Sequence, residues 1–183
     1  MSAEQGCRIL LIGMMGSGKS TIGRLVAAAT GWPYVDNDEL VRRSHGTTAR
    51  AILAERGKEA MRAAESDALG LGLDAAAPVL IGVAAGTILD PADRARLREG
   101  GVVVWLRADA EVLESRAAGA DHRPFIDAGG ARWVRDAVIE RDPLYASVAD
   151  IVVDTGRQSA DASAEEVLGA LSAVPACQSV LGR

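Results

Sequence analysis

The chain has 183 residues, a length that predicts one compact domain covering residues 1–183. Hydrophobic residues make up 49% of the chain, which is enough for a full core, and no window approaches the 18 apolar residues of a membrane span. The net charge of −5 argues against a nucleic-acid-binding surface. We therefore expect neither a membrane nor a nucleic acid as a partner.

The elements expected in chain order follow from apolar runs, helical spacing, caps and glycine stops. They are a strand at 7–13, a helix at 19–30, a strand at 32–36, helices at 38–46, 48–56 and 58–73 with Gly57 between the last two, a strand at 78–83, a helix at 90–100, a strand at 101–108, helices at 109–119 and 131–141, a strand at 149–155 and a helix at 163–174. Strands alternating with helices predict an α/β fold, a five-stranded parallel sheet flanked by helices.

Three segments carry more specific expectations. Residues 119–130 are polar, bracketed by glycines and without an apolar period, which is typical of a lid. Ser163 and Glu166 have the spacing of a capping box at the start of the last helix. The tail, residues 175–183, follows a proline, and we expect it to be disordered.

The two cysteines, Cys7 and Cys177, lie near opposite ends of the chain. Their spacing is typical neither of a disulfide framework nor of a metal site. The first residues lack the basic region and long apolar run of a signal peptide. We therefore expect two reduced thiols in a cytoplasmic protein.

The segment GMMGSGKST, residues 13–21, matches the phosphate-binding P-loop pattern Gly-x4-Gly-Lys-Ser. It has the required context, because an apolar strand precedes it and an amphipathic helix follows it. Its glycines let main-chain N–H groups point at phosphates, and the helix N-terminus adds a positive dipole end. Lys19, one of two lysines in the chain, suits the β and γ phosphates, and the hydroxyl of Ser20 suits Mg²⁺. We expect a bound nucleotide, ATP if the protein is a kinase, to contact Gly13, Gly16, Ser17, Gly18, Lys19, Ser20 and Thr21.

Three classes of P-loop protein share this loop. A GTPase switch needs an Asn-Lys-x-Asp motif, which neither Lys19 nor Lys58 provides. A remodelling ATPase needs a longer chain and an acidic residue after an apolar third strand, but here Gly and Ala follow that strand. A small-molecule kinase accounts for the short chain, the lid segment and the acids Asp36 and Asp38 after the second strand.

With these motifs the chain resembles the shikimate kinase family, of the nucleoside-monophosphate-kinase-like P-loop group, from about residue 8 to about residue 171. The resemblance rests on several motifs in the family's order. They are Asp36-Asn37-Asp38, Arg62-x-x-Glu65, Arg116 followed by Arg123-Pro124, the block from Glu140 to Tyr145, and Asp154-Thr155-Gly156-Arg157.

The resemblance implies an ATP- and Mg²⁺-dependent phosphotransferase that converts shikimate to 3-phosphoshikimate in aromatic amino acid biosynthesis. Shikimate is a cyclic carboxylate with three hydroxyls. Arg62 and Arg141 would bind its carboxylate, because a planar guanidinium pairs with a carboxylate through two hydrogen bonds. Glu65 would hold Arg62, and Gly86 would line the acceptor site. The acceptor-binding helices would span about 38–73, and the chain would act as a monomer.

The remaining roles concern the reaction and the nucleotide. Asp38 would orient the attacking hydroxyl and take its proton. Lys19 and Arg123, the latter on the lid, would stabilise the transferring phosphoryl group. Asp36 and Ser20 would face Mg²⁺. Arg116 and Arg157 would lie on the adenine side.

Each side chain taken alone also has a plainer interpretation. Arg62 and Glu65 form a common helix-surface pair. Asp38 could be a helix N-cap and Arg141 a C-terminal cation. Arg123 could be a solvated loop charge. The order and spacing of the whole set favour the functional interpretation over each of these.

The departures from the family pattern lie on the acceptor side. Val83-Ala84-Ala85-Gly86 stands where the family has Thr-Gly-Gly-Gly, Leu53 and Met61 stand where it has Phe, and Phe125 stands where it has Leu. Three hypotheses stay open: compensated drift with shikimate as the acceptor, a pocket repacked for a related cyclitol or polyhydroxy acid, and a nucleotide-binding regulator without turnover. A methyl or two changes selectivity by only about 1–3 kcal/mol, which favours drift.

Overall fold

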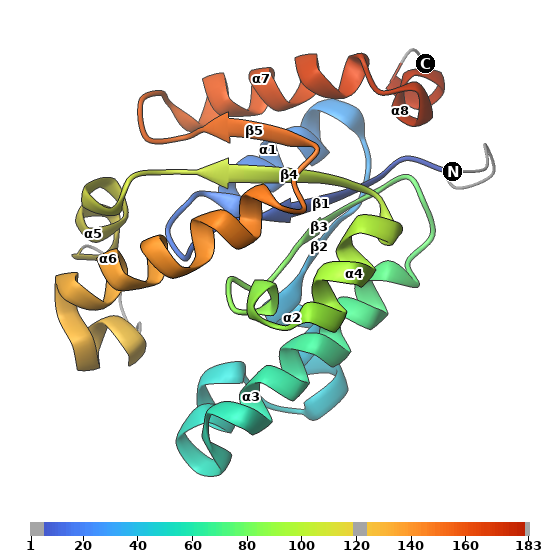
Figure 1. Cartoon of the computed structure of the whole chain (residues 1–183). Coiled ribbons are helices and arrows are strands. Elements are labelled where there is room, and N and C mark those ends of the chain that lie inside the picture. The colour runs from blue at the N-terminus through green and yellow to red at the C-terminus, as the bar shows by residue number, and fades with distance from the viewer. Residues whose placement is uncertain (1–5, 119–123, 182–183) are drawn as a thin grey trace.

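The computed structural model of the chain describes residues 6–118 and 124–181 and consists of one parallel sheet between two layers of helices (Figure 1). The sheet order is β2-β3-β1-β4-β5, and all four neighbouring pairs are parallel. The strands are β1 (Arg8–Ile12), β2 (Tyr34–Asp36), β3 (Val79–Gly82), β4 (Val102–Arg107) and β5 (Ile151–Asp154). The predicted five-stranded α/β sheet is confirmed.

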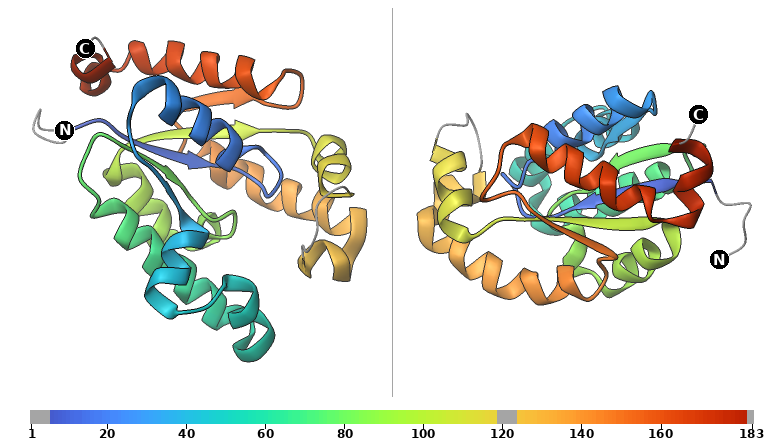
Figure 2. Two further views of the ribbon diagram at one scale, coloured as in Figure 1. Left: turned by 180° about the vertical axis from the view of Figure 1, so that it is seen from behind. Right: turned by 90° about the horizontal axis from the view of Figure 1, so that it is seen from above.

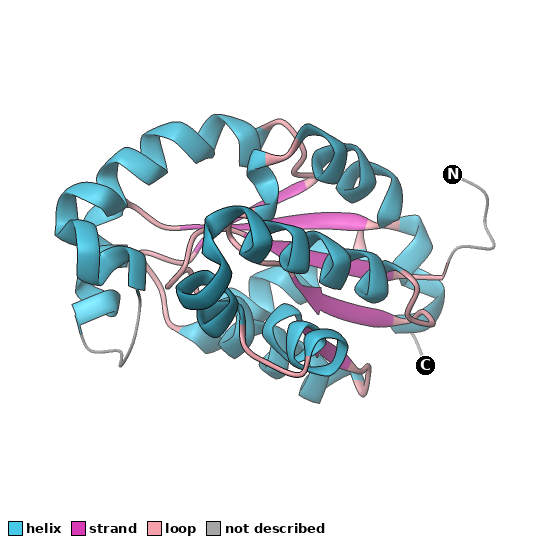
Figure 3. Cartoon of the chain, turned by 90° about the horizontal axis from the view of Figure 1, so that it is seen from below, coloured by secondary structure: helices cyan, strands magenta, loops and turns pink. Residues whose placement is uncertain are grey.

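The helices alternate with these strands, so the strands lie enclosed between helices in the view of Figure 3. They are α1 (Lys19–Thr30), α2 (Asn37–His45), α3 (Ala49–Leu73), the 3₁₀ turn η1 (Thr87–Leu89), α4 (Pro91–Gly100), α5 (Ala110–Ala118), α6 (Pro124–Ala146), α7 (Ala160–Ser172) and α8 (Pro175–Leu181). The residue that divides α3 is Gly57, with φ 84°, as the glycine between the two predicted helices indicated. Within the described residues, no helix is long and apolar enough to cross a bilayer.

The sheet buries side chains on both faces because successive residues of a strand point in opposite directions. In β1, Ile9 and Leu11 pack in one apolar cluster with α1 and α7, whereas Leu10 and Ile12 pack in another with α3, α4 and α6. Figure 2 shows α1 and α7 together on one side of the sheet. The near-continuous apolar sequence of β1 follows from this double burial.

A third apolar cluster joins α2 to α3 and is separate from the two on the sheet. Its buried members are Leu40, Val41, Ile52, Met61, Ala64 and Ala68. In Figure 2, α2 and the first half of α3 project away from the sheet beyond the carboxyl end of β2. This cluster fixes the two helices to each other, and they carry the acidic and basic side chains predicted to bind the acceptor.

Two predicted helix starts are wrong. The hydroxyl of Ser159, not that of Ser163, caps α7 by accepting from the N–H of Ala162 at 3.1 Å, and Ser163 is buried inside the helix. Residues 124–130 of the predicted irregular lid are helical, since α6 begins at Pro124. Proline at the first helical position has its φ already set for a helix and has no N–H to lose. Residues 119–123 lie outside the described part of the chain.

The predictions for the chain end and for the cysteines are also wrong. The tail forms α8 over Pro175–Leu181 instead of being disordered, and Cys177 in this helix is joined to Cys7 by a disulfide. Both cysteines are buried where α8 packs beside the start of β1. The pair is 170 residues apart in sequence, so only the folded chain brings the two thiols together.

Candidate active site

The P-loop connects β1 to α1 at the carboxyl edge of the sheet. Three of its glycines have positive φ: Gly13 at 139°, Gly16 at 87° and Gly18 at 96°. Gly13 also lacks space for a side chain, because a Cβ there would lie 2.4 Å from the carbonyl oxygen of Leu106. The loop therefore needs glycine for both conformation and space, and it leads directly into the N-terminus of α1 at Lys19.

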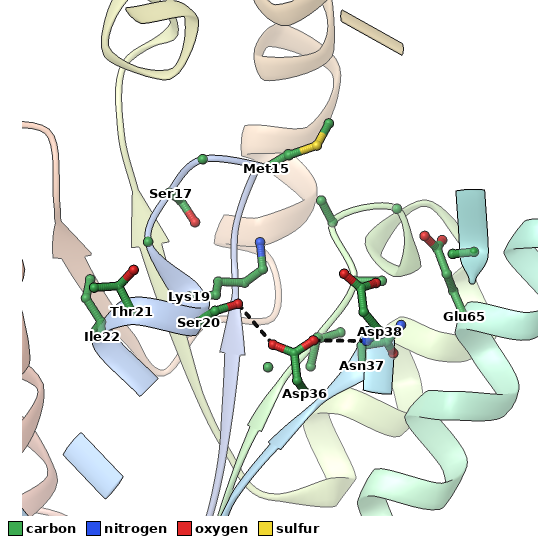
Figure 4. A pocket seen from close by; sticks show the side chains of 18 of the residues that line it. Met15, Ser17, Lys19, Ser20, Thr21, Ile22, Asp36, Asn37, Asp38 and Glu65 are labelled. Atoms are coloured by element: carbon green, nitrogen blue, oxygen red, sulfur yellow. Dashed lines mark hydrogen bonds between the residues drawn. The ribbon is translucent and has the colours of Figure 1, made fainter. Parts of the chain in front are cut away.

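Lys19 and Ser20, at the start of α1, lie toward Asp36 and Asp38 at the junction of β2 and α2 (Figure 4). Lys19 Nζ donates to the carbonyl oxygens of Gly13 at 2.8 Å and Met14 at 3.0 Å. Ser20 Oγ donates to Asp36 Oδ2 at 3.0 Å. The serine and the acid predicted to face a metal ion therefore lie side by side, next to the lysine predicted to face phosphates.

Asp36 ends β2 and caps α2, because its Oδ1 accepts from the N–H of Asp38 at 3.0 Å. Asp38 lies in the first turn of the helix and points into the space between Lys19 and Glu65 (Figure 4). The prediction that Asp38 itself could be the cap is wrong. Loss of solvation in the cavity, followed by the charge of Asp36, raises the pKa of Asp38, while Lys19 and Arg42 act in the opposite direction.

Arg62 and Glu65 form a short ion pair on α3 in which Arg62 Nη1 donates to Glu65 Oε2. Burial raises the pKa of Glu65, and the charge of Arg62 opposes that rise. The guanidinium lies over Gly86, where a Cβ would fall inside its volume. Gly86 has an ordinary φ of −90°, so this position needs glycine for space alone.

Arg141 is 5% exposed and lies within α6, which continues through Pro143 to Ala146. It is therefore not a cap at the helix end, the plainer interpretation of its place in the sequence. Its guanidinium carbon lies 5.5 Å from the ring centroid of Trp133. Near it, the buried hydroxyl of Tyr145 donates to the carbonyl oxygen of Ala85 at 2.8 Å, which ties α6 to the turn after β3.

On the other side of the P-loop, Arg116 bridges two loops. Its Nη1 donates to the carbonyl oxygen of Gly16 at 3.2 Å, and its Nη2 donates to that of Thr155 at 2.6 Å. Thr155 Oγ1 in turn donates to the carbonyl oxygen of Ser17 at 3.0 Å. Arg157 is exposed and lies 3.7 Å from Asp154, outside the lining of the cavity described next.

One cavity of about 690 Å³ joins these groups. Among the described residues, its lining includes the predicted residues Gly16, Ser17, Gly18, Lys19, Ser20, Thr21, Asp36, Asp38, Arg62, Gly86, Arg116 and Arg141. Gly13 lies behind it in the loop, and Arg123 falls outside the described residues. The P-loop and the two arginines predicted to bind a carboxylate thus share one space.

The cavity also contains residues that sequence reasoning missed. Tyr34 donates to Asp36 Oδ2 at 3.0 Å and occupies space that side chains at Gly23 and Gly82 would need. Arg50, in the first turn of α3, adds a third cation on the acceptor side, and Trp133 adds an aromatic wall. The sequence signal for Tyr34 was the pair of glycines, Gly23 on α1 and Gly82 on β3, that leave room for its ring. Trp133 had none, because nothing local distinguishes it from a core aromatic.

The residues with described side chains that depart from the family pattern line the cavity. Val83, Ala84, Ala85, Leu53 and Met61 all line the cavity that also contains Asp38, Arg62 and Arg141. Val83 and Met61 are also buried in the apolar clusters, so each contributes to the core as well as to the wall. The side chain of Phe125 lies outside the described part of the structure.

Known proteins resemble this chain over most of its length. The sequence model described as "Shikimate kinase" matches residues 15–172. A shikimate kinase from Nitratidesulfovibrio vulgaris is 44% identical over 80% of this chain and 86% of that protein. One from Paramagnetospirillum magneticum is 36% identical over 93% of this chain and 87% of that protein.

A solved structure, the shikimate kinase from Acinetobacter baumannii in complex with shikimate, superposes with a TM-score of 0.85. It is 29% identical, and the match covers 91% of this chain and 93% of that one. The family resemblance seen in the motifs is therefore confirmed by whole-chain similarity in both sequence and fold. The chain belongs to the shikimate kinase family.

Proposed function

We propose that this chain transfers the γ-phosphoryl group of ATP to a hydroxyl of shikimate, forming 3-phosphoshikimate and ADP. The observation that carries the proposal is the single cavity with the P-loop at one end and Arg62 and Arg141 at the other. Membership of the family and the fold shared with a shikimate-bound kinase support it. The acid between the two ends, Asp38, stands where a transferred group would pass.

The acceptor end favours a carboxylate. The buried Nε atoms of Arg62 and Arg141 have no hydrogen-bond partner among the described residues. Burying an unpaired charged donor is costly, and a carboxylate can accept from two guanidinium donors at once. A ring that carries a carboxylate would satisfy these groups, whereas a neutral cyclitol would leave them unpaired.

Asp38 is the base in this mechanism. A raised pKa brings a carboxylate closer to the pH at which a general base works best. From its place between the P-loop and α3, Asp38 accepts a hydrogen bond from the attacking hydroxyl and orients it toward the phosphoryl group. Catalysis then consists of positioning and charge stabilisation, as is usual for phosphoryl transfer.

The residues at the P-loop fit a magnesium ion. Ser20 Oγ and Asp36 Oδ2 are oxygen donors 3.0 Å apart, and Mg²⁺ prefers oxygen ligands. When bound, the ion would neutralise charge on the β and γ phosphates. Lys19 adds a compact cation on the same side, and Tyr34 holds Asp36 in orientation through its hydroxyl.

The proposed function also assigns roles to the arginines near adenine and to the lid segment. Arg116, fixed by main-chain carbonyls, would contact adenine, with Arg157 at the outer side of that loop. Residues 119–130 would act as a lid carrying Arg123 toward the phosphates, and residues 38–73 as the acceptor-binding unit. Closure of such a lid excludes water, which would otherwise compete for the phosphoryl group.

We further propose that the chain works as a monomer in the cytoplasm, where ATP is plentiful. The Cys7–Cys177 disulfide is unusual for that compartment. Thiol titration of protein purified from cells under alkylating conditions tests the location. Two blocked thiols per chain support a reduced cytoplasmic form, and none supports an oxidising compartment.

The activity is tested by ADP release from ATP and Mg²⁺ with shikimate, quinate, neutral cyclitols and sugar acids as separate acceptors. We expect strong stimulation by shikimate and none by the neutral cyclitols. Stimulation by another acid but not by shikimate would reassign the acceptor. ATP binding without ADP release from any acceptor would contradict the enzyme proposal.

A further inference from the structure

Trp133 lines the acceptor side of the cavity, and the mechanism above gives it no role. It lies on α6, eight residues before Arg141, and its indole ring faces the guanidinium of that arginine at 5.5 Å. Trp133 is half-buried, whereas Arg141 is almost fully enclosed. The pair therefore forms the boundary between the cavity and the helix layer.

The charge of Arg141 has few polar partners among the described residues. Its Nη1 is 4.0 Å from Met14 Sδ, a weak acceptor, and its Nε is 3.8 Å from Glu140 Oε2, beyond hydrogen-bonding distance. Glu140 is itself 62% exposed, so water screens that pair. The hydroxyl of Tyr145 and the charge of Glu65 also interact with Arg141, and the face of Trp133 adds a cation–π contact.

The contact between Arg141 and Trp133 differs in kind from the ion pair that holds Arg62. Glu65 accepts from Arg62 Nη1, so it uses one donor of the arginine and neutralises its charge. An aromatic ring attracts the guanidinium through its face, while the five N–H donors radiate in the guanidinium plane. Trp133 therefore stabilises Arg141 without using a donor or cancelling the positive charge.

We propose that Trp133 is a positioning residue for the acceptor: it holds the guanidinium of Arg141 with its charge intact and its Nε–H, which has no partner among the described residues, ready for the acceptor carboxylate. This rests on the proposed function. The two arginines are then held in different ways: Arg62 by the carboxylate of Glu65, and Arg141 by the ring of Trp133. Trp133 then acts on acceptor binding and leaves the nucleotide site unaffected.

The kinetic test compares Trp133→Leu with Trp133→Phe, which keeps an aromatic face. A desolvated cation–π contact corresponds to about a tenfold change in binding. We expect Trp133→Leu to raise the KM for shikimate about tenfold, with the KM for ATP within about twofold of the wild type. Trp133→Phe should stay within about threefold for both substrates, since a phenyl face is a weaker partner of the same kind.

An unchanged KM for shikimate in Trp133→Leu would overturn the proposal. So would an equal rise in the KM for ATP, because a general loss of structure affects both sites. Trp32→Phe is the matched control, since Trp32 is buried in the cluster with α1 and α7, away from the acceptor side. It should leave both KM values within about twofold of the wild type.

A fluorescence titration gives a second readout that does not depend on turnover or on the folding of Trp133→Leu. Adding shikimate to the wild type and to Trp32→Phe should change the tryptophan emission, and Trp133→Phe should lose most of that change. A full change in Trp133→Phe would overturn the proposal. The two failures are distinguishable: a wild type that releases no ADP with shikimate contradicts the proposed function, whereas normal turnover with unaltered Trp133 variants contradicts only the positioning role.

Discussion

The two ends of the cavity are formed by different kinds of groups, main chain at one end and side chains at the other. The nucleotide end is made of main chain, with three glycines at positive φ and a lysine and an arginine held by carbonyl oxygens of the loop itself or its neighbour. The acceptor end is made of side chains from α2, α3, the turn after β3 and α6. A main-chain site accepts few substitutions, whereas a side-chain site can vary its walls one residue at a time.

This difference explains where the chain departs from its family. The P-loop pattern is complete, and every divergent residue with a described side chain lines the part of the cavity outside the P-loop. The charged residues in that part of the cavity, Asp38, Arg62 and Arg141, are retained. In the proposed function these charges would determine the class of acceptor, and the apolar residues between them would adjust its fit.

The largest effect is expected from Lys19→Ala, which removes a charge from the main-chain end. We expect kcat to fall by about 10²–10³-fold with any acceptor, as for other preorganised charges at a transition state. Shikimate binding, followed by fluorescence, should change little because Lys19 lies across the cavity from Arg62. Lys58→Ala, the exposed second lysine, is the matched control. Unchanged turnover in Lys19→Ala would refute the P-loop assignment.

A smaller effect is expected from Gly86→Ala at the side-chain end. The new Cβ would occupy the position of the Arg62 guanidinium, so the arginine must move. We expect the KM for shikimate to rise about 30-fold, the size of losing one member of a buried charge pair, with little change for ATP.

Two comparisons separate this effect from a loss of stability. Gly169→Ala is the control, because a Cβ there meets nothing within 4 Å. Combining Gly86→Ala with Arg62→Ala should be no worse than Arg62→Ala alone, since both act through one guanidinium. Additive losses would show that Gly86 contributes by another route.

The smallest effect concerns the pH dependence of kcat/KM, which should fall as pH drops through the raised pKa of Asp38, because the base is then protonated. Arg42 favours the ionised form of Asp38, so Arg42→Ala should move this acid limb to higher pH. Arg43→Ala is matched to it, since Arg43 also pairs with Glu39. A limb that stays in place would argue against Asp38 as the base.

Local signals made much of this molecule predictable. Apolar runs marked the strands, and the spacing of Gly13, Gly18 and Lys19 identified the loop without any tertiary information. Gly57 marked the break in α3 for the same reason, because a positive φ is a local requirement.

The features that the sequence did not predict depend on tertiary contacts. The disulfide joins residues 170 apart, and α8 is held by packing beside β1 that no local pattern encodes. The capping-box spacing favours Ser163, but Ser163 is fully buried in the core and lies inside the helix, so Ser159 is the cap. Trp133 reached the acceptor side only through the path of α6, which starts seven residues earlier than its apolar period indicates.

The central claim is that Asp38, Arg62 and Arg141 determine the class of acceptor, whereas the apolar residues of the cavity wall change only the relative activity with similar acceptors. The most direct test is kcat/KM for shikimate and quinate in the wild type and in the triple variant Val83→Thr/Ala84→Gly/Ala85→Gly, which restores the family pattern. We predict that shikimate is the better acceptor of both proteins and that the ratio of its kcat/KM to that of quinate changes by less than about 100-fold, the range of one or two methyl groups. A wild type without shikimate activity that gains it in the triple variant would contradict the account.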